Sequence, residues 1–181
     1  MAEQRVSARY ALALLNTAKP ENLVDAVFND LVFVEQHITA SKDFKNLVKS
    51  PVITHWQKKN IFKEMFESNL HKLTLNFFML LIDKRRESLL YDIIKQYNKL
   101  YNELNNLLEV SITSANDLSE DVKNLISQKL TEITNKKIIS KYSIDKSLKG
   151  GVQINIDGWV YDASIAGMLD KLHKSLVEGS K

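Results

Sequence analysis

Catalytic chemistry needs side chains that can hold a metal, move a proton or attack a substrate, and few groups in this chain are spaced for such work. The sequence has no cysteine, so it offers neither a thiol nucleophile nor a thiolate metal ligand. A metal site needs several converging ligands, whereas the four histidines have no histidine four residues away and no nearby carboxylate cluster. They are His37, His55, His71 and His173. We interpret them as surface or capping histidines and predict no metal site.

A group of acids and a pair of glycines could also form sites. Asp117, Glu120 and Asp121 could make a catalytic set, but they surround a serine at an expected helix start, where acids favour the positive end of the helix dipole. Gly150 and Gly151 precede an expected strand, so they lack the helix N-terminus that phosphate-binding glycine loops use. The sequence therefore predicts no catalytic residue and no cofactor.

The densest basic run is Lys84, Arg85 and Arg86, which could contact RNA or phosphate. It follows an apolar helix, where cations also favour the negative end of the dipole, and we prefer that structural role. The chain has 25 basic and 22 acidic residues, a net charge of +3, and neither half is strongly basic. A broad electrostatic grip on nucleic acid or anionic lipid is therefore not indicated.

The composition, 44% apolar and 26% charged, is that of a soluble globular protein. Five glycines and two prolines among 181 residues leave little room for turns and predict a mainly helical chain. Apolar spacing predicts five long helices and one short one in residues 1–105, a six-helix bundle on short connections. Pro20 is expected in the first turn of the second helix, and Thr54 with Gln57 matches a capping box. Ser50 and Pro51 should end the short helix.

Two of these helices, at residues 4–18 and 71–82, carry more apolar positions than one core contact requires. Either both lie at the centre of the bundle, or together they form a groove for an amphipathic helix from another protein. Spacing alone favours burial, because large apolar residues are mostly inside.

The pattern changes after Asn105, and residues 106–181 are predicted to form a small α+β domain. Alternating apolar residues predict three strands, and Asp157-Gly158 is a strong signal for a two-residue hairpin to a fourth. A helix after Ser119 should be buried through Leu125, Ile126, Leu130 and Ile133. The last helix, at residues 163–177, has an apolar face made of Ile165, Met168, Leu169, Leu172 and Leu176.

Neither a leader nor a membrane span is predicted. Residues 1–5 include an acid and precede any apolar run, unlike a signal or transit peptide. The longest apolar run, residues 77–82, is far shorter than the roughly 20 residues of a span.

Several stretches, in this order, give the chain a resemblance to the delta subunits of bacterial F-type ATP synthases, the family that includes the mitochondrial oligomycin sensitivity-conferring protein (OSCP). They are residues 8–14, residues 47–51 with Lys58 and Lys59, residues 76–86 with Tyr97 and Leu100, residues 144–154, and residues 160–165 with Leu169. Two places depart from the family pattern. Asp162-Ala163-Ser164 stands where the family usually has Asp-Gly-Ser, and residues 166–168 lack the arginines often found there.

The resemblance implies a non-catalytic part of the peripheral stalk, a stator that resists rotor torque during proton-driven ATP synthesis. In such proteins the N-terminal bundle holds the N-terminal helix of an alpha subunit, and the C-terminal domain joins the C-terminal ends of the b subunits. The expected location is the cytoplasmic face of the bacterial inner membrane, as a peripheral protein. An all-helical RNA-binding or antitermination factor, contacting RNA through residues 84–86, is the alternative. An enzyme has no support in the sequence.

The family's groove lies between its first and fifth helices, which correspond to residues 4–18 and 71–82. Those are the two helices with excess apolar positions, so the resemblance favours the groove interpretation over simple burial. We therefore expect the groove to be lined by Tyr10, Ala11, Ala13, Leu14, Asn76, Met79 and Leu80.

Overall fold

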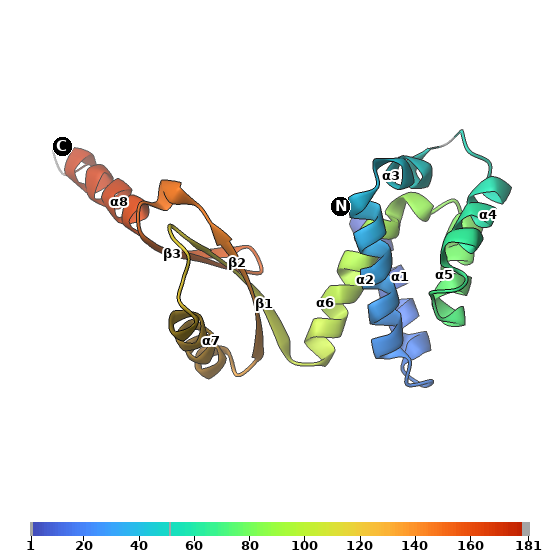
Figure 1. The fold of residues 1–181 in the computed structure, drawn as a ribbon, viewed down its shortest axis with the longest axis horizontal. Coiled ribbons are helices and arrows are strands. Elements are labelled where there is room, and N and C mark those ends of the chain that lie inside the picture. Colours follow the sequence, from blue (N-terminus) through green and yellow to red (C-terminus); the bar gives the residue numbers. More distant parts are fainter. Residues whose placement is uncertain (1, 51, 179–181) are drawn as a thin grey trace. The chain divides into compact units, whose positions relative to one another are not determined.

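The computed structural model describes residues 2–50 and 52–178, and the chain divides into two compact units, Met1–Tyr101 and Asn102–Lys181. Figure 1 shows helices in the first unit and a sheet with two helices in the second. Each unit has an apolar core of its own, so each is described by itself. The mainly α fold with a small α+β part is confirmed. The boundary after residue 105 stays a prediction.

Among the described residues of the first unit, six α-helices begin, five long and one short, as predicted. A single turn of 3-10 helix, η1 (Glu87–Leu89), leads into the sixth. The α-helices are α1 (Ala2–Ala18), α2 (Val24–Ala40), α3 (Lys42–Lys49), α4 (His55–Phe66), α5 (Lys72–Asp83) and α6 (Leu90–Leu104).

The predicted capping box at the start of α4 is confirmed. The Gln57 amide N–H donates to Thr54 Oγ1 at 3.4 Å, and the Thr54 N–H donates to Gln57 Oε1 at 3.1 Å. These bonds satisfy backbone donors that the helix itself cannot pair. The short α3 ends at Lys49, next to the predicted stop, but Pro51 lies outside the described residues.

The predicted start of the second helix at Pro20 is wrong, because α2 begins at Val24. Residues 19–22 form a turn instead. Asn22 adopts a left-handed φ of 55°, and the Leu23 N–H donates to the Ala18 carbonyl at 3.0 Å. This is the usual way to close a helix C-terminus, so the chain reverses before the next helix can begin.

Aromatic rings fill much of the core of the first unit. Phe62 lies at the centre of one group, with ring centroids 5.3 Å from Phe44, 5.8 Å from Phe66 and 6.2 Å from Phe78. These three partners come from α3, α4 and α5, and tilted and edge-to-face ring contacts favour one arrangement of the helices over others.

The second unit is a four-stranded sheet with strand order β2-β1-β3-β4. β1 and β2 are parallel and joined through α7, whereas β1–β3 and β3–β4 are antiparallel. The predicted Asp157-Gly158 hairpin joins β3 to β4, with both residues at positive φ. The elements are β1 (Leu107–Ser114), α7 (Glu120–Thr134), β2 (Lys137–Ile144), η2 (Lys146–Leu148), β3 (Gly151–Ile156), β4 (Trp159–Ser164) and α8 (Ile165–Glu178).

The core of the second unit is small and centres on Leu108, Val110 and Ile112 of β1. The prediction that four apolar residues bury α7 is wrong for two of them. Leu125 is 56% exposed and Ile133 is 77% exposed, and only Ile126 and Leu130 pack against the core. The reason is that α7 packs on the β2 side of the sheet and meets it along one narrow face.

Ser164 and Asp162 precede α8 and make hydrogen bonds at its N-terminus. The Gly167 N–H donates to Ser164 Oγ at 3.0 Å, and the Ser164 N–H donates to Asp162 Oδ1 at 2.8 Å. Hydrogen bonding from the side chain and the backbone N–H of Ser164 lowers the pKa of the Asp162 carboxyl. The Ala163 departure from the family pattern therefore leaves this helix start intact.

Candidate partner-binding surfaces

The sequence-predicted residues of α1 divide into two groups in the structure. Ala11 is fully buried and Leu14 is 2% exposed, and both belong to the core of the first unit. Tyr10 is half-buried, and Ala13 is exposed. Tyr10 and Ala13 are therefore the members of this group that another protein could touch without the helix moving.

An aromatic contact brings α1 next to α5. The rings of Tyr10 and Phe77 meet edge to face, with centroids 6.3 Å apart. Leu80 follows Phe77 by three residues, so it lies on the same side of α5, and it is 45% exposed. The structure thus places Tyr10 of α1 and the Leu80 side of α5 beside each other, with Phe77 between them.

The remaining two predicted residues, Asn76 and Met79, both reach toward α4. They line a cavity of about 480 Å³ together with Lys63 and Glu67 of that helix. Asn76 is exposed and Met79 half-buried, so both have accessible surface. Asn76 and Met79 therefore both have a neighbour in α4, and the assignment of all seven residues to one groove stays a prediction.

The last helix presents an apolar face that nothing in the second unit covers among the described residues. Its five members are about half exposed or more, at 47% for Ile165, 58% for Met168, 49% for Leu169, 56% for Leu172 and 64% for Leu176. They recur at helical spacing, and so large an apolar surface marks a place for a partner.

The sequence analysis missed a buried ion pair between Lys58 and Glu87. Their Nζ and Oε1 atoms are 2.6 Å apart, and the side chains are 3% and 9% exposed. Lys58 also donates to the Val48 carbonyl at 3.4 Å, so it ties α4 to α3 and η1. The partners are 29 residues apart, and no local pattern in a sequence marks such a pair.

The basic run at residues 84–86 closes the C-terminus of α5. Arg85 has a left-handed φ of 54°, and the Arg86 N–H donates to the Leu81 carbonyl at 2.8 Å. The Lys84 N–H donates to the Leu80 carbonyl at 3.0 Å. These backbone contacts close the helix and place the three basic residues at its C-terminal end, where the sequence analysis expects cations to be favourable.

Two of the four histidines, His37 and His71, and two of the three acids, Asp117 and Glu120, have structural partners, whereas His55 Nδ1 is buried without a hydrogen-bond partner. His71 Nδ1 accepts from the Leu73 N–H at 3.2 Å and caps α5, while Lys123 lies 2.8 Å from Glu120 and 3.9 Å from Asp117. The hydrogen bond to Glu120 raises the pKa of Lys123. Across residues 2–50 and 52–178, no group of three or more histidine or acidic side chains could hold a metal ion. Within the same ranges no helix is both long and apolar enough to span a bilayer.

Comparison with known proteins gives one consistent result. A family model described as ATP synthase delta (OSCP) subunit matches residues 6–176. "ATP synthase subunit delta" of Chlorobium phaeobacteroides strain BS1 is 33% identical over 178 residues, which cover 98% of this chain and 99% of that protein. The protein of the same name from Acetivibrio thermocellus is 35% identical over 176 residues, covering 97% and 99%.

The fold also has a solved counterpart. A chain in the cryo-EM structure of the Toxoplasma gondii mitochondrial ATP synthase hexamer superposes with a TM-score of 0.76. The match covers 94% of this chain and 97% of that one at 20% identity, so it supports the fold alone.

Proposed function

This chain belongs to the ATP synthase delta (OSCP) subunit family, and we propose that it is a non-catalytic stator protein linking the catalytic head to the stalk formed by the b subunits. The main support is the match of the family model to residues 6–176, which spans both compact units. A protein that joins two partners needs two separate surfaces, and each unit offers one. The match with the delta subunit family favours this role over the RNA-binding alternative.

The first surface takes the N-terminal helix of an alpha subunit. It is formed by Tyr10 and Ala13 of α1 with Asn76 and Leu80 of α5, and Phe77 lies between the two helices. An amphipathic helix laid here would gain roughly 25 cal/mol for each Å² of apolar surface removed from water. Ala11 and Leu14 support the surface from the core beneath it.

The second surface takes the C-terminal ends of the b subunits. It is the exposed apolar face of α8, made of Ile165, Met168, Leu169, Leu172 and Leu176. A helical stalk end with an apolar stripe would cover this face in the manner of a coiled coil. Held by these two partners, the protein lies at the cytoplasmic face of the bacterial inner membrane, attached through the complex.

The decisive test measures binding of the purified chain to a synthetic peptide, the N-terminal helix of the alpha subunit from the same organism. Ala13→Glu should reduce the affinity at least 100-fold, because it places an unpaired charge in an apolar contact. Ala13 is exposed, so the variant should keep its circular dichroism spectrum and melting temperature.

The matched control is Leu12→Glu, which adds the same charge to α1 about 100° further round the helix. Leu12 is 47% exposed, and its variant should bind the peptide within about twofold of the wild type. Unchanged binding by the folded Ala13→Glu variant would refute this placement of the alpha-subunit helix.

A further inference from the structure

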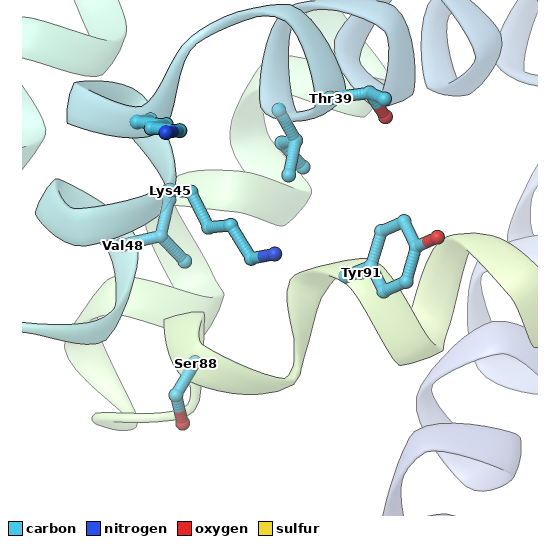
Figure 2. Close-up of a pocket in the computed structure, with 7 residues that line it drawn as sticks. Thr39, Lys45, Val48, Ser88 and Tyr91 are labelled. Atoms are coloured by element: carbon cyan, nitrogen blue, oxygen red, sulfur yellow. The ribbon is translucent and has the colours of Figure 1, made fainter.

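A cavity of about 410 Å³ lies between α2, α3 and η1 with the start of α6, and none of its lining residues belongs to either proposed partner surface. Figure 2 shows Lys45 reaching into this space toward Tyr91, with Thr39, Val48 and Ser88 around it. We propose that this cavity binds a small anion with an apolar body, either a carboxylate or a phosphate monoester. The proposal is independent of the stalk role.

The charged residues that line the cavity are all positive. Lys42 and Lys45 line the cavity, and no acid is among the described residues that line it. Neither lysine takes part in an ion pair within the described part of the chain. Two uncompensated ammonium groups at one opening make a positive potential that an anion would neutralise.

The position of these lysines is unfavourable for the helix that carries them. Both lie on α3 three residues apart, where like charges face each other and repel. Lys42 is also the first residue of α3, at the end where the helix dipole disfavours a cation. A bound anion would offset both the repulsion between the lysines and the unfavourable interaction of Lys42 with the helix dipole. These unfavourable positions therefore favour a ligand-binding role for the two lysines.

The rest of the lining sets the class of ligand. Ile38 and Val48 are buried, at 6% exposure each, and give the cavity an apolar floor. Thr39, Ser88 and Tyr91 complete the lining, and the Thr39 hydroxyl donates to the Glu35 carbonyl at 2.8 Å. A ligand site with an apolar body and a few polar groups has this composition, and the volume falls in the usual range for small molecules. An apolar chain would lie on the floor with its acidic head at the lysines.

The Tyr91 ring is already held in place. Lys95 Nζ lies 4.5 Å from the ring centroid, a cation–π contact that occupies one face. Tyr91 is 38% exposed, so part of the residue remains accessible to a ligand. Lys95 therefore places a third positive charge next to a residue that lines the cavity.

The test titrates the purified full-length chain with hexyl phosphate and with hexanoate and follows backbone amide shifts by NMR. Saturable shifts at Thr39, Lys45, Ser88 and Tyr91 are expected from at least one of these anions. The tighter of the two identifies the head group as phosphate ester or carboxylate. Neutral hexanol should bind at least tenfold more weakly, because it cannot pair with the lysines.

The double variant Lys42→Gln/Lys45→Gln keeps long side chains but removes both charges, and it should bind at least tenfold more weakly. Lys99→Gln removes one charge from α6 at an exposed site outside the cavity and should bind within twofold of the wild type. The proposal fails if neither anion saturates at millimolar concentration, if hexanol binds equally well, or if the double variant matches the wild type.

Discussion

At the scale of single residues, the buried pair of Lys58 and Glu87 illustrates what a charge costs inside a helical unit. The second carboxylate oxygen of Glu87 is buried without a hydrogen-bond partner, so Lys58 is the main compensation for this negative charge. Removing one member of a buried pair usually costs much more than removing both, because the remaining charge is left uncompensated.

We therefore predict that Lys58→Met lowers the free energy of unfolding by about 3–5 kcal/mol. The double variant Lys58→Met/Glu87→Leu should regain most of that loss. Lys59→Met, which breaks the more exposed pair with Asp83, should cost less than about 1 kcal/mol. Urea denaturation followed by far-UV circular dichroism gives all three values. Equal losses for Lys58→Met and the double variant would contradict the argument.

The buried Tyr97 should make the free energy of unfolding fall at alkaline pH. It is buried, its hydroxyl donates to the Val24 carbonyl at 3.2 Å, and burial with the nearby Asp25 charge raises its pKa from 10.0 to about 12. A raised folded-state pKa stabilises the fold fully below pH 10 and progressively less as the pH rises toward 12.

In wild type, the free energy of unfolding should fall between pH 10 and 12. Tyr97→Phe should make that slope shallower by up to about 1.4 kcal/mol per pH unit, the limit for a single titrating group. The measurement is urea denaturation at several pH values in that window. An alkaline slope that is the same in the variant and the wild type would rule out Tyr97 as the titrating group.

The surroundings of a residue were predicted well where they depended on local spacing and poorly where they depended on distant parts of the chain. Ala11 and Leu14 were placed on an apolar side of α1, but their complete burial depends on which helices pack there. Lys58 was noted only for its family resemblance, because the position of Glu87 is a property of the folded unit. Candidate surfaces can be marked from sequence, whereas which of their residues remain accessible cannot.

At the scale of elements, the β3–β4 hairpin contains two glycines that differ in their surroundings. Both have positive φ, 76° for Gly151 and 89° for Gly158. A Cβ at Gly151 would collide with the Ala163 carbonyl of the neighbouring strand, whereas a Cβ at Gly158 would meet nothing within 4 Å. Comparing glycine-to-alanine substitutions at the two positions therefore distinguishes the cost of backbone strain from the added cost of a steric clash.

Gly158→Ala should cost about 1–2 kcal/mol through strain alone. Gly151→Ala should cost about 3 kcal/mol or more, because β4 must also move away from β3. Urea denaturation followed by far-UV circular dichroism gives both values. Equal costs at the two positions would show that the close approach of the Ala163 carbonyl does not matter.

Element type was predictable throughout, but helix boundaries and the fate of apolar faces were not. The α2 start moved from Pro20 to Val24 because a left-handed Asn22 closes α1, and that conformation has no strong sequence signal. Leu125 and Ile133 were expected to be buried on spacing alone, yet the small sheet leaves them exposed. Periodicity shows that a face is apolar, and only the neighbouring elements decide what covers it.

At the scale of the whole molecule, the two units carry separate apolar surfaces, one on α1 and α5 and the other on α8. A linking protein must hold both partners at the same time. Since the two surfaces belong to different compact units, a charge in one should leave binding at the other unchanged. This independence can be tested without the rest of the complex.

We predict that the full-length chain forms a ternary complex with two fragments, the N-terminal helix of an alpha subunit and the last helical segment of the b subunits. Leu172→Glu should lose at least 100-fold in affinity for the b fragment and keep the alpha peptide, because it puts a charge on the apolar face of α8. Ala13→Glu should show the reverse loss. Isothermal titration calorimetry of each partner, alone and in the presence of the other, gives the affinities.

Lys174→Glu is the matched control for the α8 substitution. It adds the same acid on the opposite face of α8 and breaks only the exposed pair with Asp170, whose side chains are 66% and 59% exposed. It should retain both partners. If Leu172→Glu keeps its affinity for the b fragment, the b subunits bind elsewhere and the exposed face of α8 needs another occupant. If each partner excludes the other, the chain cannot act as the link, because a stator must transmit load through both contacts at once.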